Sequence, residues 1–217
     1  MHSAIRKFLS GTSAKVLGFL LSLLPFLNLG LRSYRGDITA NPVEFFQHQT
    51  GDWTLRFLIF TLCVTPFRKL FHLPELIRFR RMLGLFAFFY VCLHFFTYLG
   101  PDQSFSLAGM FKDVAKRPFI TVGFAAFVLL IPLAITSTAG WIRRLGGKRW
   151  QILHRSIYAC AILGVIHYYW LVKSDVRKPL FYGVLVAILL GWRLFSWLQT
   201  PKAPATVPAR SAQTLSS

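Results

Sequence analysis

The stretch "LHRSIYACAILGVIHYYW", residues 153 to 170, is an almost unbroken apolar run with a histidine near each end. Apolar runs of this length are typical of transmembrane helices, because about 20 residues at about 1.5 Å each span the hydrocarbon of a bilayer. Lipid offers an imidazole no hydrogen-bond partner, so His154 and His167 need an explanation beyond membrane insertion.

Five further runs share this apolar character. The chain of 217 residues is 54% hydrophobic, above the roughly 45–50% of soluble domains. The six predicted spans are residues 15–32, 53–72, 82–100, 118–138, 150–172 and 179–199. We therefore expect an all-α integral membrane protein, a six-helix bundle over 15–199, with a cytoplasmic N-terminal segment at 1–14 and a disordered cytoplasmic tail at 200–217.

The net charge of +18 is distributed unevenly between the two sides of this bundle. The basic clusters "RFRRM" (78–82) and "RRLGGKR" (143–149) lie on one predicted side with Glu75. The other six acidic residues lie in the opposite loops: Asp37, Glu44, Asp52, Asp102, Asp113 and Asp175. Because basic loops stay in the cytoplasm, both termini are predicted to be cytoplasmic, with anionic membrane lipid and no nucleic acid as partner.

The N-terminal segment and the three cysteines are interpreted as structural features. The basic and apolar start imitates a signal peptide, but no A-x-A-like cleavage site follows it, so we expect an uncleaved first helix. Cys63, Cys92 and Cys160 lie inside predicted helices without a CxxC pair, which is typical of small buried hydrophobic residues rather than disulfides or metal ligands.

Three histidines lie within predicted spans. His94, in "FFYVCLHFFTYLG", is 13 residues beyond Arg81 at the inner end of its span, or ~20 Å along the helix axis. His154 starts its span near the inner face, so His94 and His167 are predicted to share a depth in the outer half. Two neutral imidazoles facing each other across a bundle suit a six-coordinate haem b iron. Zinc would need further Cys, Asp or Glu ligands, which that depth lacks, and hydrogen-bonded structural histidines are the alternative.

His154 and His167 are 13 residues apart on the same predicted span. Thirteen residues at about 100° each leave His154 about 140° from His167 around an ideal helix. The two share a face only if the helix is distorted, and otherwise two cofactors would pack on different sides. A haem at His154 would have Arg81 and Arg155 beside its propionates, since arginine binds carboxylates well and iron poorly.

The second ligand of such an inner haem is left open by the sequence. It is absent, supplied by His72 at the inner end of the second span, or provided by a group that the pattern does not reveal. His48 lies in the outward loop 33–53, where it is an ordinary loop histidine or a contact for a partner or a quinone.

The helices "RRMLGLFAFFYVCLHFFTY" and "LHRSIYACAILGVIHYYW" and the segment "NPVEFFQHQTG" resemble the MsrQ (YedZ) family. "RPFITVGFAAFVLLIPLAITST" and "RRLGGKRWQILHRSIYA" continue the similarity over residues 15–198. This family is the haem-binding membrane subunit of the bacterial periplasmic methionine sulfoxide reductase system. It belongs to the ferric reductase and NADPH oxidase transmembrane superfamily, in which histidine pairs on two helices hold two stacked haems.

The resemblance implies a bacterial inner-membrane protein with one or two haem b groups, for which His94, His154 and His167 correspond to the family's haem histidines. It implies electrons from the quinone pool or a cytosolic flavin reductase, delivered within a heterodimer to a periplasmic molybdopterin catalytic subunit that reduces methionine sulfoxide in oxidised proteins. FMN is also implied by the resemblance alone, since the chain shows no flavin motif.

The sequence favours an electron-transfer subunit over a complete enzyme. It contains no G-x-G-x-x-G loop, and the predicted spans leave no stretch for a flavin- and nicotinamide-binding domain. The first alternative is a self-standing ferric reductase-like or oxygen-reducing transmembrane haem protein. The second is a transporter or scaffold whose histidines are structural.

Overall fold

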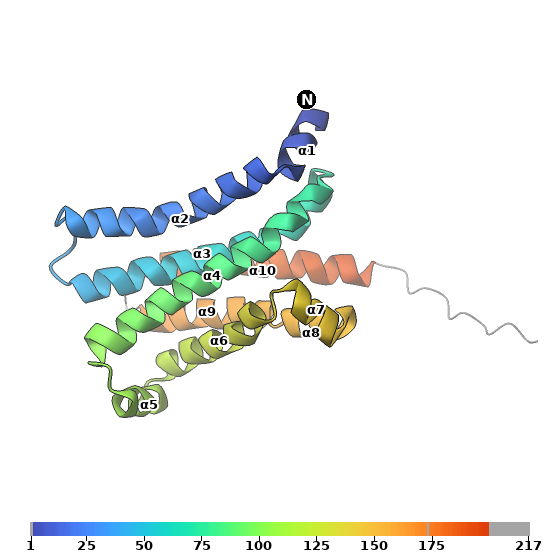
Figure 1. Cartoon of the computed structure of the whole chain (residues 1–217). Helices are drawn as coiled ribbons and strands as arrows, with labels where there is room; N and C mark the ends of the chain where they lie inside the picture. The colour runs from blue at the N-terminus through green and yellow to red at the C-terminus, as the bar shows by residue number, and fades with distance from the viewer. Residues whose placement is uncertain (1, 173, 200–217) are drawn as a thin grey trace, which may run out of the picture.

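A computed structural model describes residues 2–172 and 174–199, and the predicted disordered tail at 200–217 lies outside these ranges. Every regular element in the described part is a helix, which confirms the all-α prediction (Figure 1). The elements are α1 (His2–Ser10), α2 (Thr12–Tyr34), α3 (Pro42–Leu70), η1 (Pro74–Leu76), α4 (Ile77–Thr97), η2 (Tyr98–Asp102), α5 (Leu107–Lys116), α6 (Pro118–Ile135), α7 (Ala139–Leu145), α8 (Gly147–His154), α9 (Ile157–Leu171) and α10 (Arg177–Leu198).

The long helices α2, α3, α4, α6, α9 and α10 run alongside one another (Figure 1). The most extensive packing is of α3 on α4, followed by α6 on α9 and α10 on α9. One end of the bundle, called here the basic end, carries α1, α7, α8 and the last turns of α10. The opposite end carries α5 and the α2–α3 connection and is called the α5 end.

Four segments of the described residues are long and apolar enough to cross a membrane: Thr12–Tyr34, Pro74–Pro101, Pro118–Ile135 and Arg177–Leu198. They make this a membrane protein by length and composition. The other two long helices do not meet the same criterion, because α3 carries several charged residues along its 29 residues and α9 has only 15. Six crossings and two cytoplasmic termini therefore stay predictions.

Two helix boundaries differ from those predicted. Residues 42–53 of the segment 33–53, expected to be an outward loop, form the first turns of α3. Asn41 accepts a hydrogen bond from the N–H of Glu44 at 3.3 Å, and Pro42 occupies the first turn. The predicted span at 150–172 is divided, with α8 ending at His154 and α9 beginning at Ile157. The helix is thus interrupted between His154 and His167, and only His167 lines the cavity described below.

The core lies where α3, α4 and α9 meet. The ring of Phe57 stacks on that of Tyr90, with centroids 5.2 Å apart and planes 9° apart. Ala87, Cys160 and Ala161 are fully buried, so small side chains let the helices approach closely. By contrast, leucines on the outer face of α2 are more than half exposed, as suits a surface in contact with lipid.

The hydroxyl of Tyr90 enters the hydrogen-bond ladder of α2 next to Pro25, which lies inside that helix. It accepts a hydrogen bond from the N–H of Phe26 at 3.1 Å and donates one to the carbonyl of Ser22 at 2.9 Å. The side chain thereby bridges two backbone groups that lie one helical turn apart. The contact ties the peripheral helix α2 to the core.

Candidate functional site

His94, in the last two turns of α4, is anchored by the backbone of α3. Its Nδ1 lies 3.0 Å from the carbonyl oxygen of Gln47. Because a carbonyl oxygen only accepts, Nδ1 is the donor and carries the proton of the neutral ring. Nε2 therefore keeps its lone pair and is the nitrogen available to a metal.

His167, in the last two turns of α9, is held in the same way by α6. Its Nδ1 lies 2.7 Å from the carbonyl oxygen of Phe119, in the first turn of that helix. Its Nε2 also keeps its lone pair. Metal-binding histidines usually donate the other ring N–H to such a carbonyl, which fixes both the tautomer and the direction of the ring.

The imidazoles of His94 and His167 lie side by side, with centroids 6.1 Å apart and planes 79° apart. Two metal–nitrogen bonds of about 2 Å, with about 1 Å from each nitrogen to its ring centre, add to about 6 Å. The centroid separation matches this sum for two imidazoles whose Nε2 atoms point toward a shared metal ion.

Two glycines face these rings from the neighbouring helices. A Cβ atom on Gly51 of α3 would lie 3.2 Å from Cε1 and Nδ1 of His94. A Cβ atom on Gly123 of α6 would lie 2.6 Å from Nδ1 of His167, closer than real Cβ contacts come. Each histidine thus occupies space that any larger residue at the glycine would take.

A cavity of about 350 Å³ adjoins both histidines between α3, α4, α6 and α9, within the roughly 300–1,000 Å³ range of cofactor pockets. Its walls are mostly apolar and aromatic: Leu55, Leu58, Val91, Phe95, Phe124, Phe127 and Leu130. Gly164 also lines it, and a Cβ there would make an ordinary contact with Leu55 at 3.5 Å. The shape and lining suit a large apolar ligand.

Charged side chains lie at the rim of the cavity near the α5 end. Asp52 lies 3.7 Å from the guanidinium of Arg56, whose Nε donates to the hydroxyl of Tyr182 at 3.0 Å. Arg117 forms an ion pair with Asp113 at 2.6 Å. Each of these two carboxylates is thus balanced by an arginine one helical turn away.

The protein supplies few metal ligands at this place. Among the described residues, no group of three or more His, Cys, Asp or Glu side chains is arranged to hold a metal ion. A tetrahedral zinc site needs more protein ligands than the two imidazoles. A haem iron needs only axial ligands from the protein, because the porphyrin supplies the remaining four nitrogens. The residues present therefore fit haem.

Comparisons with known proteins identify the family of this chain. The model of the family "Ferric reductase like transmembrane component" matches residues 50–165. A protein from Herminiimonas arsenicoxydans named "Protein-methionine-sulfoxide reductase heme-binding subunit MsrQ" is 53% identical over 206 residues, 94% of each chain. The chain belongs to the MsrQ family. Relatives of the same name from Azospira oryzae and Rhodospirillum rubrum are 54% and 50% identical over 81% of this chain, and over 76% and 85% of their own. No solved structure matches.

His154 lies apart from the cavity of this MsrQ family member. Its Nε2 is 3.0 Å from the hydroxyl of Thr136, and its ring stacks on Trp150 with centroids 3.9 Å apart. The Thr136 hydroxyl donates its only proton to the carbonyl of Pro132 at 2.6 Å, so it accepts from His154. In this arrangement Nε2 carries the proton and is not free to bind iron.

The structure does not bring the other predicted inner residues to His154. Arg81 and Arg155 are exposed and do not line the cavity. Arg80 is partly buried instead and acts electrostatically on His154. His72 is exposed just beyond α3, with a left-handed φ of 55°.

His48, whose role the sequence left open, lies on the first turns of α3 at the rim of the cavity. Its Nε2 is 3.6 Å from a carboxylate oxygen of Glu44, and its side chain is partly exposed. His48 therefore lines the same cavity as His94 and His167 but is not one of the two facing rings.

Sequence reasoning missed the groups that hold and shape the histidine pair. No sequence signal identifies the backbone carbonyls of Gln47 and Phe119 as acceptors, because every residue has a carbonyl. Arg193 was also missed, although an arginine inside the apolar run of α10 is a visible signal, since ionisable groups in such runs are usually functional.

Proposed function

We propose that the chain binds haem b between His94 and His167 and acts as the haem-binding electron-transfer subunit of a methionine sulfoxide reductase. The observation that carries this proposal is the pair of rings 6.1 Å apart, each with Nδ1 held by a backbone carbonyl. The names of the relatives support the same cofactor and the same system. Haem supplies one-electron chemistry when bound.

The chain's own residues perform three tasks in this function. The carbonyls of Gln47 and Phe119 orient the imidazoles before the cofactor binds, so little reorganisation is needed. Gly51 and Gly123 leave room for the rings. The apolar cavity wall excludes water from the ligand, which lowers the local dielectric around the site.

The proposed setting is the bacterial inner membrane, with six spans and both termini in the cytoplasm. The arginine clusters at the basic end support this orientation, because basic segments stay on the cytoplasmic side. Electrons would come from the quinone pool or a cytosolic flavin reductase. They would leave at the α5 end for a periplasmic molybdopterin catalytic subunit, which forms a heterodimer with this chain and repairs oxidised methionine in proteins.

A second haem at His154, with Arg81 and Arg155 at its propionates, is the part of this proposal that the geometry supports least. Thr136 and Trp150 already engage the ring of His154, and both arginines are exposed. FMN rests on the family resemblance alone, because no cavity of the described residues carries a recognisable flavin motif.

The test is haem spectroscopy of purified variants. His94→Ala and His167→Ala are each expected to abolish the low-spin b-type spectrum of the haem at this pair, because each removes one of the two imidazoles that would hold the iron. His72→Asn is the matched control, since that histidine is exposed and asparagine tolerates its positive φ. Full haem content with an unchanged spectrum in both alanine variants would sink the proposal.

A self-standing ferric reductase-like or oxygen-reducing haem protein is the alternative function, favoured by the description of the matching family model. The two functions differ in the electron acceptor. Reduced protein should reoxidise slowly with ferric iron or oxygen alone and rapidly when the periplasmic catalytic subunit and methionine sulfoxide are added. Equal rates with and without that subunit would favour the alternative.

A further inference from the structure

Arg193 extends from α10 toward a backbone carbonyl that α3 leaves free. Pro66 lies inside α3 and has no N–H, so the carbonyl of Leu62, four residues earlier, lacks its helical partner. One guanidinium nitrogen of Arg193 donates to this carbonyl at 2.8 Å. The arginine therefore repairs the hydrogen-bond ladder of α3 from a neighbouring helix.

The other terminal nitrogen of Arg193 has no such partner. It is buried and makes no hydrogen bond within the described part of the chain. The guanidinium carbon lies 5.2 Å from the ring centre of Tyr158, which offers a cation–π contact and no acceptor. A buried guanidinium N–H without an acceptor lowers the stability of the fold, so an external acceptor that bonded to it would stabilise the protein.

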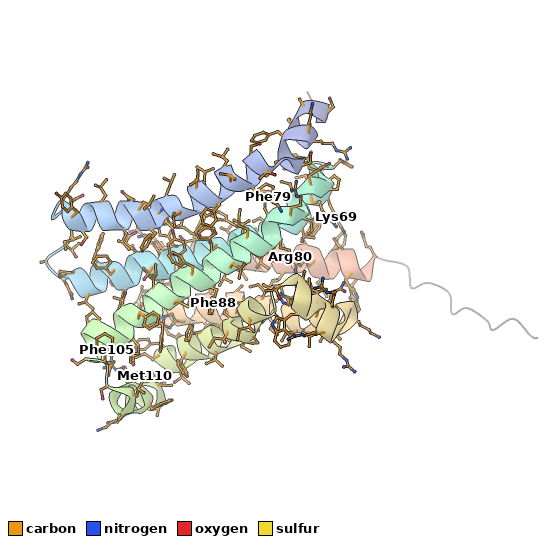
Figure 2. The ribbon with its side chains drawn as sticks, in the orientation of Figure 1. Lys69, Phe79, Arg80, Phe88, Phe105 and Met110 are labelled. Atoms are coloured by element: carbon orange, nitrogen blue, oxygen red, sulfur yellow. The ribbon has the colours of Figure 1, made fainter. Side chains whose placement is uncertain are left out.

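A second cation faces the same region. Arg80 is partly buried on α4, on the half of that helix nearer the basic end, as Figure 2 shows. It acts electrostatically on both Arg193 and His154. None of the ion pairs found within the described residues involves Arg193. Two like charges in a low-dielectric interior repel each other unless an anion lies between them.

We propose that Arg80 and Arg193 form a binding site for one anionic oxygen group, a phosphate or a carboxylate, in the half of the bundle nearer the basic end. Guanidinium groups suit this chemistry because they donate two parallel hydrogen bonds to such a group. Two sources reach this depth: the phosphate of an anionic phospholipid, since basic pockets between membrane helices bind such headgroups, and the carboxylates of a porphyrin beside His154. The site does not depend on haem between His94 and His167.

The experiment compares Arg80→Gln and Arg193→Gln with Arg143→Gln, which removes an exposed arginine of α7 at the basic end. Each full-length protein is placed in nanodiscs of phosphatidylcholine with or without phosphatidylglycerol. Thermal stability, bound phospholipid by native mass spectrometry and haem per chain are measured. Arg193→Lys keeps the charge and loses the forked donor, so it supplies a second variant at that position if Arg193→Gln folds poorly.

If the ligand is a lipid phosphate, phosphatidylglycerol raises the Tm of the unmodified protein and co-purifies with it. In the two Gln variants the affinity for phosphatidylglycerol is about tenfold lower, so both effects are smaller. For a porphyrin carboxylate, the same variants lose about half of the haem, while bound lipid is unchanged. Either result supports the site, provided that Arg143→Gln behaves as the unmodified protein.

The proposal is overturned if Arg80→Gln and Arg193→Gln match Arg143→Gln in lipid dependence, bound lipid and haem content. A lower Tm of Arg193→Gln in every lipid reflects only the lost bond to Leu62, so it does not count in favour. The spectrum due to His94 and His167 is recorded in parallel. If this spectrum persists in the Arg80 and Arg193 variants, a negative result for the anion site does not contradict the proposed function of His94 and His167.

Discussion

A Cβ atom placed on Gly123 would lie 2.6 Å from Nδ1 of His167. The same nitrogen donates to the carbonyl of Phe119, in the first turn of α6. One helix thus both holds the imidazole and leaves the gap into which it fits. The position of the ring depends on the absence of a side chain as much as on a hydrogen bond.

Gly123→Ala is therefore expected to displace the ring of His167 and to weaken haem binding without removing a ligand. The added methyl group overlaps the ring and breaks the bond to Phe119, which also frees the tautomer. Absorption spectroscopy should show lower haem content or a shift from low to high spin. Gly191→Ala is the control, because a Cβ there meets no atom within 4 Å. Equal spectra for the two variants would contradict the role of Gly123.

His154→Ala is expected to leave the low-spin spectrum of the His94 and His167 site unchanged, because His154 does not line that cavity. The variant loses the hydrogen bond to Thr136 and the stack on Trp150, so the free energy of unfolding should fall by about 1–3 kcal/mol. Total haem per chain then shows whether a second haem binds at His154. Unchanged haem content supports a structural histidine, whereas loss of half of the haem would establish a second site at His154.

Tyr90→Phe is expected to destabilise the protein by about 1–2 kcal/mol, because the hydroxyl serves two backbone groups of α2. Thermal unfolding in detergent measures the change. Tyr34→Phe serves for comparison, since Tyr34 is 91% exposed and Tyr90 only 1%. If both variants unfold at the same temperature, the hydroxyl does not tie α2 to the core.

The orientation of the bundle is testable with reporter fusions. A reporter placed after Gly146, in the loop between α7 and α8, should be cytoplasmic, and one placed after Gln103, before α5, should be periplasmic. The reason is the concentration of arginine and lysine at the basic end. The opposite result would reverse the proposed direction of electron flow.

Much of the histidine pair was accessible from the sequence. His94 and His167 lie at a common depth because a helix rises by a constant amount per residue, so counting from the basic clusters places both in the same half. The counting did not work for His154 and its expected arginines. The neighbour of His154 depends on how α6 packs against α8, and the orientation of Arg80 rather than Arg81 toward the interior depends on the rotation of α4.

The sequence by itself determined that this is a helical membrane protein with histidines inside its apolar segments, because hydropathy and charge are properties of residues one at a time. It did not determine which nitrogen of His94 or His167 is free. That choice belongs to the carbonyls of Gln47 and Phe119, which come from other helices. Nor did it determine the contact of Arg193 with Leu62, 131 residues away. Such pairings arise only when helices pack, because packing brings together groups that no local pattern connects.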